Sequence, residues 1–319
     1  MDLTTHYMGL QLKNPLVASA SPLSADLDNI RHLEDSGAAA IVLPSIFEEQ
    51  IEADALHETR TAVGLENSAD ARGHLPESNQ RETQQYLNLI RRAVEAVDIP
   101  IIGSLNGTTE EGWISYAKMI EEAGATSLEL NVYLIPTDIS LTGRDVEQRY
   151  VEILRAVRKA VDIPIAIKLG PHFSSMGQVA IEFANAGADA LVLFNRFYQP
   201  DIDLTKLRLL NGLQLSKAIE IGVPLMWIAV LSGRIDASLA ASTGVENSEQ
   251  VLKYLLAGAD VVMTTSALLR NGPRYVKELL AGTRGLLSQR NFRNPDSFGR
   301  ANYMKILQGY EYTGSRTGN

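Results

Sequence analysis

The chain has 319 residues, a formal net charge of -9 at pH 7 and no cysteine. The absence of cysteine excludes disulfides, thiolate metal sites, cysteine-ligated iron–sulfur clusters and cysteine nucleophiles. The acidic balance, without any run of Lys or Arg, argues against nucleic acid or an anionic membrane surface as a partner, because both bind clustered positive charge. No apolar run approaches the roughly 18 residues of a membrane span, and the N-terminal stretch lacks the regions of a secretory signal. We therefore expect a cytoplasmic protein that acts on a small molecule.

Short apolar runs alternate with longer amphipathic stretches along the chain, as expected when the strands of a parallel sheet are buried on both faces. The opening stretch THYMGLQLKNP alternates like a small hairpin, which we expect to close the bottom of a barrel. Strands are predicted at 16–19, 39–43, 101–104, 127–131, 165–168, 190–194, 237–240 and 261–264. Helices are predicted at 25–36, 81–96, 110–123, 146–160, 176–186, 248–256 and 273–286.

The segment 207–232 fits as the remaining crossover, with a helix and a further strand-like or helical piece around 225–231. The four stretches SGAAAIVL, AGATSLEL, AGADALVL and AGADVVMT each place glycine just past a helix and lead into a strand, as a helix C-cap requires. This internal repetition favours a barrel over an open sheet. Since single barrels commonly run from about 200 to over 400 residues, we predict a (β/α)₈ barrel of one domain over 1–319.

The stretch 47–79 is too long for an ordinary connection, so we expect a functional lid, an interface arm or a mobile loop. A solvated loop without a role is the alternative. The tail is expected to be frayed over 313–319.

Catalytic groups of such barrels lie at the carboxyl ends of the strands, so polar residues there are the first candidates for function. Lys168 is the sharpest, because it places an ammonium at the end of an apolar strand, where burial without a partner is costly. It must face something anionic or electron-rich. A structural salt bridge to a carboxylate elsewhere in the barrel is the alternative to a functional role.

Asn131 and Asn195 also end strands, and amides there can recognise the edge of a heterocycle, although each could equally cap its loop. The loops after the last two strands contain small residues whose backbone N–H groups can point at an anion, which is the usual phosphate site of this fold. The candidates in these loops are Ser242, Thr243, Gly244, Thr265 and Ser266. Ordinary turn formation is the alternative for them.

The segments ASAS, SLNG, LELN, IAIKLGP, LFN, STGV and TTSALLRNGP together resemble the dihydroorotate dehydrogenases, which are FMN-containing barrels. The resemblance implies that Ser19, Ala20 and Ser21 line the isoalloxazine and that Lys168 sits by its N1/C2 edge. It implies that Asn106 and Asn131 bond near the ring or the ribityl chain, and that Asn195 faces flavin or substrate. The two last loops would hold the phosphate. Related barrels often pair, so we expect a homodimer.

The chain departs from this family in the loop after the fourth strand. Family members carry a Cys or Ser base in a pattern like N-x-S-C-P-N, whereas this chain reads NVYLIPTD, with Leu134 at the base position. Leucine cannot accept a proton. Substitute bases could be Thr137, Ser140, Tyr133 or His172, of which we favour Tyr133 for position and His172 for its imidazole.

Two further family positions differ. Pro44 replaces a lysine that contacts the flavin, and Tyr133 and Pro136 stand where polar substrate contacts would be expected.

The sequence thus predicts an FMN-dependent oxidoreductase that transfers hydride between flavin N5 and a small dihydropyrimidine-like substrate, with a soluble electron acceptor. One alternative is an aldolase-type lyase, in which Lys168 forms a Schiff base and Gly244 and Ser266 hold a substrate phosphate. Another is a flavin-binding protein that has lost catalysis.

Overall fold

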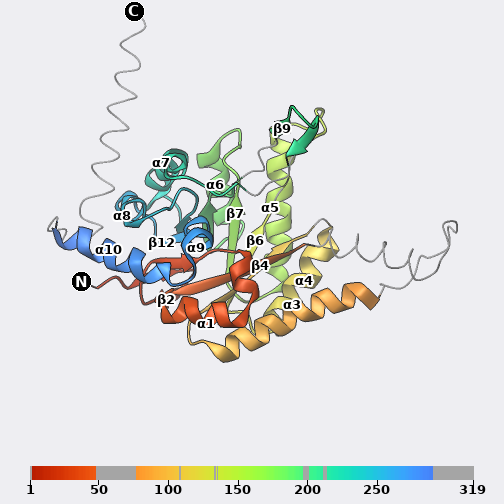
Figure 1. Ribbon diagram of the computed structural model, residues 1–319. Helices are drawn as coiled ribbons and strands as arrows, with labels where there is room; N and C mark the ends of the chain where they lie inside the picture. Colours follow the sequence, from red (N-terminus) through yellow and green to blue (C-terminus); the bar gives the residue numbers. More distant parts are fainter. Residues whose placement is uncertain are drawn as a thin grey trace, which may run out of the picture.

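The computed structural model describes residues 2–47, 77–107, 109–132, 134, 136–196, 201–210 and 214–289. Within them, parallel strands close into a barrel in the order β11-β12-β3-β4-β5-β6-β7-β8. The predicted (β/α)₈ architecture is confirmed (Figure 1). The barrel strands are β3 (Leu16–Ala18), β4 (Ala40–Phe47), β5 (Ile101–Asn106), β6 (Ser127–Asn131), β7 (Ile165–Leu169), β8 (Ala190–Leu193), β11 (Ser238–Ala241) and β12 (Val261–Thr264).

Helices surround the barrel (Figure 1). They are α1 (Leu27–Asp35), α3 (Glu77–Ala96), α4 (Glu110–Glu122), α5 (Gly143–Ala160), α6 (Met176–Asn185), α7 (Gly222–Leu231), α8 (Ser248–Ala257), α9 (Ser266–Asn271) and α10 (Tyr275–Gln289), with two 3₁₀ turns, η1 (Pro22–Ala25) and η2 (Ala218–Ile221). The uncertain piece around 225–231 is helical and belongs to α7. None of the described helices is long and apolar enough to cross a membrane.

Local capping explains where several helices begin and end. Helix α5 starts three residues before the predicted position, because Thr142 and Asp145 form a reciprocal capping box. The glycines predicted to follow helices, Gly37, Gly124, Gly187 and Gly258, all have left-handed backbone angles, with φ between 97° and 104°. Glycine alone adopts that conformation without a steric penalty from Cβ, so these four positions end their helices and turn the chain into the next strand.

An N-terminal hairpin closes the amino end of the barrel. Strands β1 (Thr5–Tyr7) and β2 (Leu10–Leu12) pair antiparallel, as the alternating sequence predicted. Tyr7, Met8 and Leu12 are buried and pack against the apolar side chains inside the barrel. The opposite, carboxyl end of the barrel is therefore the open one.

The barrel interior changes character along its axis. Lower positions carry apolar side chains such as Val17, Ile102 and Ala166. Because side chains alternate along a strand, the residues two positions further on share the same face. The polar residues at these upper positions are Ser19, Ser104 and Lys168, and all three are buried. The fold thus gathers buried polar groups at the carboxyl end of the barrel.

A second hairpin was not predicted. Strands β9 (Asp201–Asp203) and β10 (Arg208–Leu210) follow β8 and extend away from the barrel (Figure 1). Each strand has three residues, too few for a period of two to stand out in the sequence. The predictions for most of 47–79 and for the tail at 313–319 lie outside the described residues.

Candidate functional site

A cavity of about 260 Å³ opens at the carboxyl end of the barrel, lined by the ends of β3, β7, β8, β11 and β12 and by the segment 214–216. Its volume is close to the lower limit of about 300 Å³ for small-molecule sites. The predicted site residues that line it are Ser19, Ala20, Ser21, Lys168, Asn195, Ser242, Thr243, Thr265 and Ser266. Asn106, Asn131 and Gly244 lie outside this lining.

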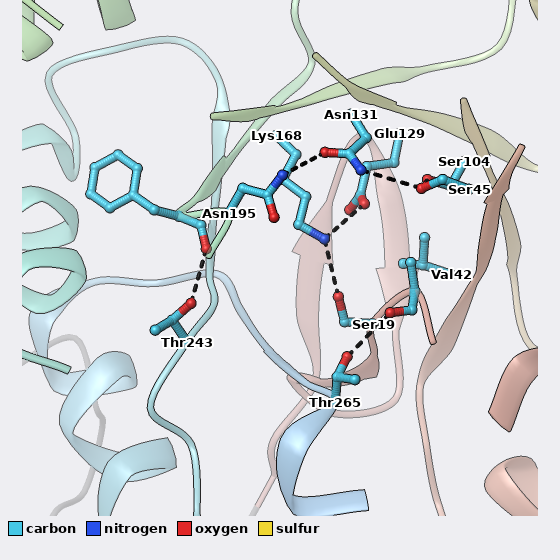
Figure 2. Close-up of polar contacts among 12 residues, drawn as sticks. Ser19, Val42, Ser45, Ser104, Glu129, Asn131, Lys168, Asn195, Thr243 and Thr265 are labelled. Carbon is cyan, nitrogen blue, oxygen red and sulfur yellow. Dashed lines mark hydrogen bonds and ion pairs between the residues drawn. The ribbon is translucent and has the colours of Figure 1, made fainter. Parts of the chain in front are cut away.

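Lys168 lies between a buried carboxylate and the cavity. Its Nζ is 3.2 Å from Oε1 of Glu129 and 3.5 Å from the hydroxyl of Ser19 (Figure 2). Glu129 has an exposed fraction of 0% and Lys168 of 7%. The salt bridge considered as the alternative for Lys168 is present, and the same ammonium also lines the cavity.

Glu129 was missed in the sequence. It stands in the middle of the buried strand LELN, where a charge must face the barrel interior and find a partner. Its Oε2 has no hydrogen-bond partner among the described residues, nor does the hydroxyl of Tyr7 in the hairpin. Burial raises the pKa of Tyr7 well above its usual value, and the negative charges of Glu129 and Asp260 raise it further. Tyr7 therefore stays neutral, and Lys168 is the cation that balances Glu129.

A chain of side-chain hydrogen bonds crosses the top of the barrel. The amide nitrogen of Asn195 donates to the amide oxygen of Asn131 at 2.7 Å, and the amide nitrogen of Asn131 donates to Ser45 at 3.4 Å (Figure 2). The hydroxyls of Ser45 and Ser104 are 2.7 Å apart. Asn195 is the member of this chain that lines the cavity, and Asn131 orients it from behind.

The position of Pro44 coincides with an irregularity in the sheet. Pairing of β4 with β5 shifts register between Val42 and Ser45, consistent with the missing N–H of proline. The hydroxyl of Tyr86 on α3 accepts a hydrogen bond from Ser104 N–H at 2.9 Å and donates to its carbonyl at 3.1 Å. Burial raises the pKa of Tyr86, so the neutral phenol persists and satisfies this stretch of backbone.

The loops after β11 and β12 meet at Ser216. Its hydroxyl is 3.0 Å from that of Ser266 and accepts a hydrogen bond from the N–H of Gly244 at 3.2 Å. Thr243 and Gly244 have φ of 77° and 76°, so two consecutive residues adopt the left-handed region. Arg270 holds the same segment by donating to the Ser216 carbonyl at 2.7 Å.

Ser216 was also missed, because it lies in the poorly patterned crossover and has no local signal beyond its small polar side chain. Arg196 supports the same segment: it pairs with Glu220 at 2.9 Å and donates to the carbonyl of Gln214.

Other predicted phosphate ligands have donors engaged within the protein. The N–H of Ser242 donates to the Leu193 carbonyl at 2.7 Å, which extends the barrel ladder. The hydroxyl of Thr243 donates to the Phe194 carbonyl at 3.1 Å, and that of Thr265 to the Ala20 carbonyl at 3.4 Å (Figure 2). These bonds brace the cavity wall.

Three of the four predicted substitute bases lie away from the cavity. His172, Thr137 and Ser140 are exposed and do not line it. Tyr133 lies outside the described residues. Leu134 is half-buried and packs against the core, and its N–H donates to the Tyr150 hydroxyl at 3.4 Å.

Comparison with known proteins places this arrangement in one family. Residues 2–287 match the family described as Dihydroorotate dehydrogenase. The catalytic subunit of dihydroorotate dehydrogenase B (NAD(+)) from Methanocaldococcus jannaschii is 26% identical over 307 residues, covering 94% of this chain and 98% of that protein.

Two further relatives are equally similar. The putative dihydroorotate dehydrogenase A (fumarate) of Aeropyrum pernix is 26% identical over 302 residues, covering 92% of this chain and 95% of its own. Subunit PreA of the NAD-dependent dihydropyrimidine dehydrogenase of Escherichia coli K12 is 26% identical over 313 residues, covering 91% of this chain and 74% of its own. The chain belongs to the dihydroorotate dehydrogenase family, whose members are oxidoreductases acting on CH–CH groups.

Proposed function

We propose that the chain is a single FMN-binding barrel domain and an oxidoreductase of a small dihydropyrimidine-like compound. The observation that carries this proposal is one cavity lined both by the buried ammonium of Lys168 and by the hydroxyls of Ser216 and Ser266. A cation and a cluster of small donors are what a flavin ring and its terminal phosphate require.

The local backbone fits a phosphate. A Cβ at Gly244 would lie 2.9 Å from the backbone nitrogen of Ile221, so only glycine allows this close approach of the two segments. The N–H of Gly244 and the hydroxyls of Ser216 and Ser266 form a compact donor set. We propose that these three groups reorient toward the phosphate when FMN is bound.

Lys168 and Asn195 would act on the ring and the substrate. FMN, when bound, supplies the two-electron chemistry. Lys168 supplies positive charge beside the ring, in a buried setting where electrostatic stabilisation is strong. Asn195, held by Asn131, offers an amide edge that suits a heterocycle with N–H and C=O groups.

The proposed substrate does not require a general base in the loop after β6. Leu134 cannot take a proton, and a positioned general base contributes typically about 10²–10⁴-fold to such a reaction. We propose that dihydroorotate itself is oxidised slowly and that the true substrate needs no base at this position. We also propose that a soluble compound accepts the electrons from the reduced flavin.

The aldolase alternative is disfavoured by the ion pair. A Schiff base requires the Nζ of Lys168 to be free to attack a carbonyl, whereas this atom is held by Glu129 at 3.2 Å and by Ser19 at 3.5 Å. A flavin protein without turnover remains an outcome of the test below.

A homodimer is part of the proposal. Ile202, Leu204 and Leu207 of the second hairpin have exposed fractions of 57%, 82% and 82%. Several large apolar side chains this exposed within one short hairpin favour a protein interface. We propose that a second copy covers them.

The test begins with the colour of the purified protein and the identity of the flavin released on denaturation. Yellow protein that releases FMN supports the proposal, and colourless protein without flavin overturns it. Reduction by dihydropyrimidines and by dihydroorotate is then followed at the flavin absorbance band. Lys168→Ala should slow reduction of the flavin. If none of these compounds reduces the flavin of the wild-type protein, a flavin protein without catalysis is favoured.

A further inference from the structure

We propose that Glu129 tunes the flavin site: the Lys168–Glu129 pair, rather than Lys168 alone, sets how strongly the cavity stabilises an anionic flavin. This inference rests on the proposed FMN function. It assigns a role to a residue that does not line the cavity and would not touch a ligand there.

The two side chains come from neighbouring strands and share the barrel interior. In the β6–β7 register, Asn131 pairs with Lys168 and Glu129 with Ala166, so the carboxylate starts two residues below the ammonium. Their atoms approach to 3.2 Å, and both side chains are almost completely excluded from solvent. Figure 2 shows Glu129 and Ser19 on either side of the Lys168 ammonium.

The burial of this pair makes its charges effective. Buried charges are screened much less than surface charges, so each acts over several ångströms. An anion in the cavity is attracted by Lys168 and repelled by Glu129 immediately behind it. Because the two charges oppose each other, Glu129 removes much of the stabilisation that an isolated lysine would provide. The pair therefore holds the site close to electrical neutrality.

The bonding of Glu129 supports a charge role over a simple bracing role. The Nζ of Lys168 donates to Oε1 of Glu129, and Oε2 has no hydrogen-bond partner among the described residues. A carboxylate that served only to tie strands together would be expected to satisfy both oxygens. If the pair had only a structural role, removing its negative or its positive charge would not be expected to change anion binding in opposite directions.

The experiment measures the affinity of the FMN-loaded protein for sulfite. Sulfite adds through its sulfur to N5 of oxidised flavin and leaves a negative charge on the ring, so its dissociation constant reports how well the site stabilises that charge. The two-electron midpoint potential is the second readout. The variants are Glu129→Gln, Glu129→Asp, Lys168→Met and the Glu129→Gln/Lys168→Met double variant.

Glu129→Gln should tighten sulfite binding about tenfold or more, because a nearby repelling charge is removed. A tenfold change corresponds to about 30 mV for a two-electron couple, so the midpoint potential should rise by at least that amount. Lys168→Met should shift both quantities in the opposite direction. Glu129→Asp, which keeps the charge, and the double variant, which removes both charges, should stay close to wild type.

Glu147→Gln is the matched control. Glu147 is also buried and bonded, accepting from the N–H of Ser174 at 3.0 Å, but it lies on α5 and does not line the cavity. It should leave sulfite affinity and potential unchanged.

Unchanged sulfite affinity in Glu129→Gln, or a shift in the same direction as Lys168→Met, overturns the inference while leaving the proposed function standing. Absence of bound FMN from the wild-type protein is the separate failure of the proposed function. If Glu129→Gln does not fold, Glu129→Asp and the double variant still decide, because an effect of the double variant as large as that of Lys168→Met excludes a contribution from Glu129.

Discussion

The hydroxyl of Ser216 lies 3.0 Å from the hydroxyl of Ser266, and this contact joins the crossover after β8 to the loop after β12. Two segments separated by 50 residues thus contribute to one donor cluster. In the same cluster the N–H of Gly244 donates to Ser216. The proposed phosphate site is therefore formed by three segments: the loops after β11 and β12 and the crossover after β8.

Ser216→Ala should weaken FMN binding about five- to tenfold, the usual effect of losing one hydrogen bond of about 1–1.5 kcal/mol. Riboflavin, which lacks the phosphate, should bind equally well before and after the change. Fluorescence titration of apoprotein with both flavins measures this. Ser288→Ala, on the exposed end of α10, is the control and should change neither affinity. An equal loss for riboflavin would show that Ser216 acts on the fold instead.

Lys168→Met should reduce the free energy of unfolding by about 3–5 kcal/mol, because it leaves the carboxylate of Glu129 buried without a counter-ion. Methionine keeps the length of the apolar stem, so packing changes little. Urea unfolding of the apoprotein gives the difference. Adding Glu129→Gln to this variant should restore most of the loss. A Lys168→Met variant as stable as wild type would contradict the loss of a stabilising buried ion pair.

Gly244→Ala should destabilise the protein by about 2 kcal/mol, since it combines a left-handed backbone with a steric clash. Its φ is 76°, and the new Cβ would lie 2.9 Å from the backbone of Ile221. Gly124→Ala is the matched control: its φ is 97°, but no atom lies within 4 Å of the added Cβ. It should cost about 1 kcal/mol, from backbone strain alone. Equal losses in thermal unfolding would rule out the close approach at Gly244.

Leu134→Cys should accelerate reduction of bound FMN by dihydroorotate about tenfold or more, since a general base is worth about 10²–10⁴-fold where it is well placed. The wild-type chain has no cysteine, so the introduced thiol is the only one that a thiol-reactivity assay detects. Stopped-flow absorbance measures the rate. Leu141→Cys, at an exposed position in the same loop region, should have no effect. No acceleration would show that features besides the base exclude dihydroorotate.

The proposed homodimer predicts that a charge on the second hairpin shifts the protein toward monomer. Leu204→Asp places a carboxylate among exposed apolar side chains and should raise the dimer dissociation constant at least about tenfold, which corresponds to about 1.4 kcal/mol. Sedimentation velocity over a concentration series measures it. Ile139→Asp, at a fully exposed position outside the hairpin, is the control. A wild-type protein that sediments as a monomer at all concentrations contradicts the dimer.

Local sequence patterns determined the barrel. Apolar runs of four or five residues were enough to place every barrel strand and most helices, since burial acts over a few neighbouring residues. A glycine after the preceding helix also marked the start of β4, β6, β8 and β12. Helix α5 still began earlier than periodicity indicated, because a hydrogen-bonded cap and not hydrophobicity sets its first turn. The polar residues at the ends of the strands were also readable from the sequence, because they directly follow the apolar runs.

The partners of these polar groups were decided only by the tertiary structure. The sequence showed that Lys168 needed an anionic neighbour, but the identity of Glu129 depended on the register of β6 against β7. Ser216 joined the two last loops only because the crossover folds back over them. Contacts between distant segments depend on strand register and chain packing, which leave no periodic trace in the sequence. Position on an element is therefore readable from sequence, whereas pairing across the barrel required the closed fold.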